Sequence, residues 1–160
     1  MKRFALTMMI AAGAMLTSHG AHAALDEATK AALAICQDQN ASPEKGIAAC
    51  TQVLGSLKGS KNIFAIRYDR GAFYSKASNN TKADEDFAAA IKIYEDDPDK
   101  ANWPVDFVGL AASSYSFRGQ IALAAHNCDA AKSFYKSAAT TAREVSERES
   151  YENMARNACK

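Results

Sequence analysis

Histidine is scarce in this sequence, and the scarcity limits the chemistry open to the chain. Two of the three histidines, His19 and His22, lie in an N-terminal segment with the features of a cleaved leader. The remaining one, His126, cannot form a metal site made of several histidines. A Ser–His–acid or Cys–His site would depend on His126 alone, in a predicted turn beside Cys128. We interpret His126 as a surface turn residue.

Other chemical signatures are missing too. The sequence has no phosphate-binding or dinucleotide-binding glycine pattern. It also lacks the calcium-loop order of acids and a basic stripe interleaved with aromatics. Acidic residues cluster at 84–86 and 95–99, which we interpret as a helix start and a solvated insert rather than acid pairs for catalysis. The sequence therefore predicts a protein that is not an enzyme, with no cofactor, metal or nucleic-acid partner.

Long apolar runs are limited to the N-terminus. Lys2 and Arg3 precede the apolar run 4–16, which is too short to span a bilayer comfortably, and 21–23 reads Ala-His-Ala, a small-x-small cleavage pattern. We expect a signal peptide at 1–23, with an uncleaved anchor as the alternative, and a mature domain at 24–160. No later run is long enough to cross a membrane. The net charge of +1 falls to −1 without Lys2 and Arg3, which gives no support to an anionic partner.

Four cysteines lie beyond the expected cleavage site: Cys36, Cys50, Cys128 and Cys159. An even number in an exported chain predicts disulfides, and the count alone permits three pairings. A redox pair is less well supported because no C-x-x-C spacing is present. These features indicate a periplasmic or secreted protein.

Segment 64–98 has the pattern of two helices joined by a turn at 78–81. Apolar residues recur at steps of three and four along its second half, which places them on one helix face: Ala83, Phe87, Ala90, Ile91 and Tyr94. Gly71 interrupts the first half, and glycine inside a helix costs about 1 kcal/mol relative to alanine. We expect Gly71 to allow close approach of the second helix, with Ala83 facing it.

The pattern resembles the tetratricopeptide repeat, a helix-turn-helix unit. The matching positions are Gly71, Tyr74, Ala83, Phe87 and Ala90, and a later hairpin repeats them at Gly119, Ala131, Tyr135 and Ala138. Arg67 departs from the pattern, since an aromatic is usual there. The resemblance implies an all-α fold, a right-handed superhelix of about three antiparallel hairpins. The hairpins would span about 25–57, 62–97 and 105–142, and a capping helix would follow at 143–160.

The resemblance also implies a disulfide pairing. It places Cys36 and Cys50 on facing helices of the first hairpin, as in exported bacterial members of the family, and Cys159 near Cys128. We therefore expect Cys36–Cys50 and Cys128–Cys159. The insert at 95–104 breaks the repeat spacing, either as a surface loop or as a longer helix followed by a turn. Its Trp103 is interpreted either as a lid over the neighbouring hairpin or as a partner-binding hot spot.

In this family the first helix of each hairpin lines a concave face that often binds a peptide. By position, the groove residues implied here are Tyr68, Ala72, Ser75, Ser116 and Gln120, with Trp103 as a further candidate. The sequence thus predicts a non-enzymatic, exported module that binds a peptide or partner protein of unknown identity. A small-molecule-binding helical domain, or an enzyme with an acid pair near Trp103, is one alternative. A structural envelope component that self-associates through its end helices is another.

Overall fold

The computed structural model describes residues 25–160, so the predicted signal peptide at 1–23 lies outside the described residues. Within that range the chain contains seven α-helices, one short 3-10 helix and no strand, which confirms the all-α prediction. The α-helices are α1 (Glu27–Gln37), α2 (Pro43–Ser56), α3 (Ser60–Lys76), α4 (Asn80–Asp96), α5 (Val105–Ala124), α6 (Cys128–Thr141) and α7 (Val145–Asn157), and the 3-10 helix η1 spans Lys100–Asn102.

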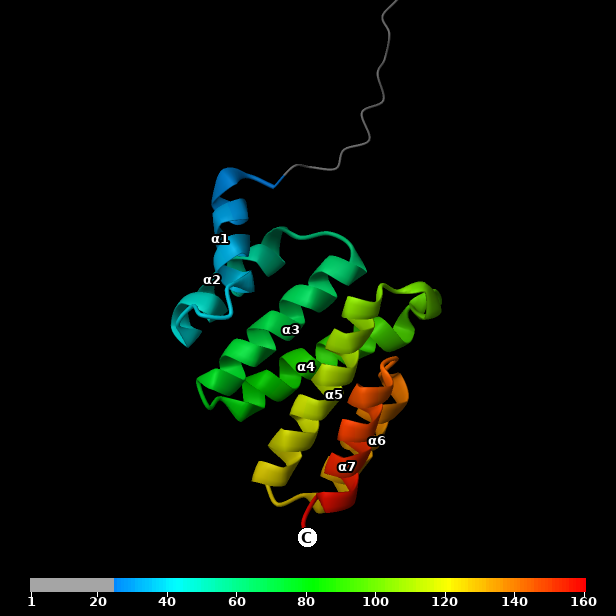
Figure 1. Cartoon of the computed structure of the whole chain (residues 1–160). Helices are drawn as coiled ribbons and strands as arrows, with labels where there is room; N and C mark the ends of the chain where they lie inside the picture. Colours follow the sequence, from blue (N-terminus) through cyan, green and yellow to red (C-terminus); the bar gives the residue numbers. More distant parts are fainter. Residues whose placement is uncertain (1–24) are drawn as a thin grey trace, which may run out of the picture.

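The helices pack in the order of the sequence. Each contacts the next, forming the helix pairs α1–α2, α3–α4 and α5–α6, with α7 packed against α6 (Figure 1). The first helices of successive pairs also contact one another, α1 with α3 and α3 with α5. The described part of the chain is therefore a sequential stack of helix pairs, in which α3 and α5 occupy the middle.

The turns inside the second and third pairs have the same construction. Ser78 and His126 adopt left-handed backbone conformations, with φ of 56° and 57°. An asparagine follows each: the Asn79 side chain accepts a hydrogen bond from the Lys82 amide, and that of Asn127 from the Ala130 amide, both at 3.2 Å. Both asparagines satisfy an amide at a helix start, which is the usual role of this residue. His126 is exposed in its turn, as expected.

Glycine and aromatic residues pair across the same two helix pairs. A Cβ atom added to Gly71 would lie 2.9 Å from Cε1 of Phe87, and one added to Gly119 would lie 2.7 Å from Cε1 of Tyr135. Both distances are shorter than carbon atoms tolerate, so each glycine leaves space for a ring. Close approach explains Gly71, as predicted, but the side chain over it is Phe87 rather than Ala83.

The insert at 95–104 belongs partly to a helix and partly to a loop. Helix α4 runs to Asp96, and the chain then turns through η1 to Trp103, which is 1% exposed. The Trp103 ring packs edge-on against Phe64 and Tyr94, with centroids 5.1 and 5.3 Å apart. Its Nε1 donates to Oδ2 of Asp97 at 2.9 Å. Trp103 therefore packs as a lid over the core beside Phe64 and Tyr94.

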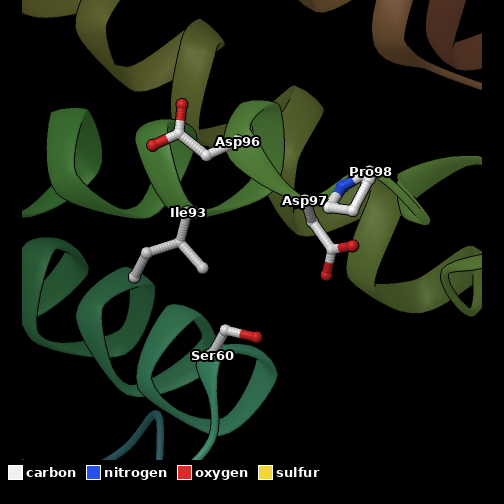
Figure 2. A pocket seen from close by; sticks show the side chains of 5 residues that line it. All are labelled: Ser60, Ile93, Asp96, Asp97 and Pro98. Atoms are coloured by element: carbon white, nitrogen blue, oxygen red, sulfur yellow. The ribbon is translucent and has the colours of Figure 1, made fainter.

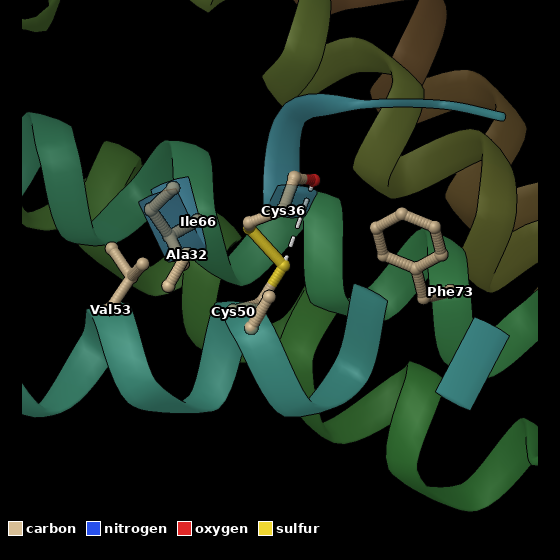
Figure 3. Packing of buried hydrophobic residues seen from close by; sticks show 7 residues of the cluster. Ala32, Cys36, Cys50, Val53, Ile66 and Phe73 are labelled. Atoms are coloured by element: carbon tan, nitrogen blue, oxygen red, sulfur yellow. Dashed lines mark hydrogen bonds between the residues drawn. A yellow bond between two sulfur atoms is a disulfide. The ribbon is translucent and has the colours of Figure 1, made fainter. Parts of the chain in front are cut away.

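The two disulfides join the pairs of cysteines expected from the hairpin resemblance. Cys36–Cys50 lies in the core between α1 and α2, where both residues are 0% exposed and pack with Ala32, Val53 and Phe73 (Figure 3). Cys128–Cys159 joins the first residue of α6 to the segment after α7, near the surface. One disulfide is thus part of the core of the first helix pair, and the other fastens the C-terminal helix.

Candidate functional site

Tyr68 of α3 packs edge-on against two aromatic rings of the neighbouring helices. Its ring centroid is 5.9 Å from that of Phe87 in α4 and 6.2 Å from that of Phe117 in α5. The ring is half-buried, and this burial is the main reason that the pKa of its hydroxyl is raised. Tyr68 therefore has a packing role where α3 meets α4 and α5.

Two other expected groove residues are small and buried. Ala72 of α3 is 8% exposed and Ser116 of α5 is 5% exposed. The Ser116 hydroxyl lies 3.9 Å from Sδ of Met154, which brings α7 onto the same side of the stack as α5. Ala72 and Ser116 therefore expose little side-chain surface. Ala72 lies on α3, which contacts α5, and Ser116 lies where α5 meets Met154 of α7.

Ser75 and Gln120 lie together in one cavity of about 170 Å³ between the α3–α4 turn and α5. The other residues lining it are Asn80, Phe117, Ile121 and Ala124. Of the six residues expected to bind a partner, these two are therefore brought to a common cavity. Trp103 lies elsewhere, in the core beside Phe64.

A larger cavity of about 450 Å³ adjoins this one. It is lined by Asn80, Thr81, Asp84, Glu85, Ile121, Ala124 and Ala125. Asp84 is held by Arg118 of α5, whose Nε donates to Oδ1 at 2.7 Å. The Arg118 guanidinium in turn lies 4.4 Å from the centroid of the Phe134 ring. Asp84, predicted only as part of a helix start, also ties α4 to α5.

The most buried ionisable group of the described chain is Asp86, which sequence reasoning did not single out. Asp86 is 2% exposed, and its carboxylate accepts hydrogen bonds from Arg67 Nη1 and Arg70 Nε, both at 2.6 Å. Bonding to Asp86 is the main cause of the raised pKa of Arg70. The spacing of the sequence does indicate this burial, because Asp86 lies three residues after Ala83 and four before Ala90, on the buried face of α4. Arg67, which stands where the family has an aromatic, is its partner.

Asp69 of α3 is the opposite case to Asp86 of α4. It is half-buried, and no hydrogen bond or ion pair to its carboxylate is found within residues 25–160. Desolvation by burial raises the pKa of Asp69 to about 6. Tyr68 adjoins it in sequence, and Asp69 contributes to the raised pKa of that hydroxyl. Helix α3 thus carries an acid whose charge has no cationic partner.

The acid pair near Trp103 does not have the arrangement of a general acid and base. Asp97 lines a cavity of about 410 Å³ with Ser60, Ile93, Asp96 and Pro98, and Figure 2 shows the Asp96 carboxylate pointing away from Ser60. The Asp99 amide and the Trp103 indole donate to Asp97, and these bonds lower its pKa. A general acid needs a raised pKa. Asp96 is engaged by Lys92 at 2.7 Å.

Within residues 25–160, no group of three or more histidine, cysteine or acidic side chains is placed to hold a metal ion. No helix in this range is long and apolar enough to cross a membrane. Comparison of the chain with protein-family models, curated proteins and solved structures found no match.

Proposed function

We propose that the protein is an exported, non-enzymatic interaction module of the tetratricopeptide-repeat type, which binds a peptide or partner protein on the side lined by α3 and α5. The observation that carries the proposal is the cavity shared by Ser75 and Gln120. These residues come from the first helices of two successive pairs, at positions that the family resemblance assigns to its groove.

The packing of the helices supports the curvature that such a groove needs. The first helices contact one another along the stack, α1 with α3 and α3 with α5, and Ser116 brings α7 to the same side. Helices on the inner side of a curved stack approach more closely than those on the outer side. We take this side as the concave face of a right-handed superhelix, with α7 as its cap.

The disulfides support export. Two disulfides in one small helical chain are typical of oxidising compartments, and the compartment proposed is the periplasm or the exterior. The predicted signal peptide at 1–23 is the matching proposal for the N-terminus.

Affinity capture from an envelope extract tests the binding side. We expect the wild-type protein to capture a reproducible partner. The Gln120→Arg variant should capture at least about 10-fold less of that partner, because a long charged side chain in the groove obstructs docking. Gln37→Arg makes the same change at an exposed position at the end of α1 and is the matched control. Equal capture by all three proteins would contradict the proposal.

A second candidate function is self-association through the first helix pair. A cavity of about 490 Å³ on this pair is lined mainly by alanines of α1 and α2 together with Ile35, which is 43% exposed. If this face joins copies of the chain, light scattering over a concentration series will show a rising mass, and Ile35→Asp will abolish the rise. A constant monomer mass excludes this candidate.

A further inference from the structure

Helix α7 buries little apolar surface against the rest of the chain. Ala155 is its one buried residue, and Ala158 follows just after the helix. Its larger apolar side chains are left in contact with water, since Val145 is 62% and Met154 is 39% exposed. Burial of alanine contributes far less than burial of a leucine or an aromatic ring, because the stabilisation follows the apolar area removed from water.

The polar contacts of α7 with other helices are also few. Within residues 25–160, the one side-chain hydrogen bond found between α7 and another helix runs from the Ser116 hydroxyl to Sδ of Met154, at 3.9 Å. Thioether sulfur is a weak acceptor. The ion pair between Arg156 and Glu152 joins two residues of α7 itself. Helices α4 and α5, by contrast, share an ion pair and a stack of two rings.

The strongest attachment of α7 is therefore the Cys128–Cys159 disulfide, which spans a sequence separation of 31 residues. Cys159 is exposed and Cys128 is half-buried, whereas Cys36 and Cys50 are 0% exposed. Thiol–disulfide exchange needs direct access to a sulfur atom. A reductant in solution can reach the second disulfide in the folded protein, and it can reach the first only after the core between α1 and α2 opens.

The position of Cys128 favours one direction of exchange. Cys128 is the first residue of α6, where the helix N-terminus stabilises a negative charge, so its sulfur is the better leaving group. A thiolate of a dithiol reductant attacks Sγ of Cys159, and Cys128 leaves as a thiolate. The second thiol of the reductant then attacks the mixed disulfide and releases Cys159. Two electrons and two protons pass to the cysteines, and the reductant becomes a disulfide.

We propose that Cys128–Cys159 is a redox-sensitive latch on α7: reduction by a dithiol releases the helix while the three helix pairs stay folded, and reoxidation closes it again. The proposal goes beyond the proposed function and requires no partner. Release of α7 uncovers a cluster on α5 and α6 that contains Ala122, Ala131 and Tyr135. In the chain-entropy model, loss of a cross-link over a loop of this size favours the open form by about 100-fold.

The first experiment measures the order in which the disulfides are reduced. Folded protein is titrated with dithiothreitol, free thiols are trapped with iodoacetamide, and the modified cysteines are located by mass spectrometry. We expect Cys128 and Cys159 to be modified at reductant concentrations that leave Cys36–Cys50 intact. The same titration in urea, where both disulfides are accessible, is the control. Simultaneous reduction of both disulfides in the folded protein, or earlier reduction of Cys36–Cys50, would overturn the proposal.

The second experiment measures release of the helix by hydrogen exchange of the full chain, before and after selective reduction. Amide protection in α7 should fall about 100-fold, and protection in α3 and α4 should stay unchanged. The variant Cys128→Ser/Cys159→Ser should show the same exchange without reductant, and reoxidation of the wild-type protein should restore protection. Unchanged protection of α7 after reduction would show that non-covalent contacts hold the helix. An equal loss in all helices would show that the disulfide supports the whole fold. Either result would contradict the latch.

Discussion

The first and second helix pairs are held together by different means. In α1–α2 the junction contains Cys36–Cys50, a disulfide with both residues fully buried. Between α3 and α4 lies Phe87, stacked on Phe117 at 4.8 Å, and beside it Asp86 bonds to Arg67 and Arg70. The first pair is thus closed covalently, and the second relies on packing and a buried ion pair. Of these two pairs, the one that contributes α3 to the proposed binding side is the one without a disulfide.

The largest effect is expected from Phe87→Ala. The ring is fully buried against Gly71 and Phe117, so its loss should lower the free energy of unfolding by about 3–5 kcal/mol. Phe87→Leu, which retains much of the volume, is the control and should cost clearly less. Urea denaturation of both variants gives the comparison. A near-neutral Phe87→Ala would show that the second pair does not depend on this ring.

Removal of the first disulfide should come next. The sequence separation of Cys36 and Cys50 is 14 residues, and closing a loop of that size stabilises by about 3 kcal/mol in the chain-entropy model. The double variant Cys36→Ala/Cys50→Ala should lose about this much. Hydrogen exchange should localise the loss of protection to α1 and α2. Equal loss in α3 and α4 would mean that the two pairs are not held independently.

A smaller loss is expected from Asp86→Asn. The side chains of Arg67 and Arg70 are 35% and 16% exposed, so water can reach them once their partner is neutral, and we expect a cost of about 2–3 kcal/mol. Asp84→Asn is the matched control on the same helix. Asp84 is 38% exposed, and its loss should cost under about 1 kcal/mol. Equal costs for the two variants would remove the distinction between a buried and a surface pair.

The smallest effect should have the opposite sign. Burial raises the pKa of Asp69 in the folded protein to about 6, above its ordinary value, so the folded state favours the protonated acid. Stability from this group is present at low pH and is lost as the pH rises through about 4 to 6. Asp69→Asn should therefore stabilise by about 1–2 kcal/mol at pH 7, after allowance for screening by water, and have little effect near pH 3. Melting curves at the two pH values test this, and a destabilised variant at pH 7 would show that the carboxylate has a partner.

The repeat pattern of the sequence predicted much of the fold for a physical reason. Gly71 predicted the close approach of a second helix, and segment 78–81 predicted a turn, because each has a local conformational cause. Asp86 was interpreted only as part of an acidic cluster at a helix start, whereas its burial depends on two arginines from another helix. Ser75 was placed by position alone. The cavity that it shares with Gln120 forms only where the turn and α5 are brought together.

The most direct test of the binding side is hydrogen exchange on the protein bound to its captured partner. The account predicts that binding increases protection in α3 and α5, centred on Ser75 and Gln120, and leaves the outer helices α2 and α6 unchanged. Protection confined to α2 or α6, with no change in α3 and α5, would contradict it.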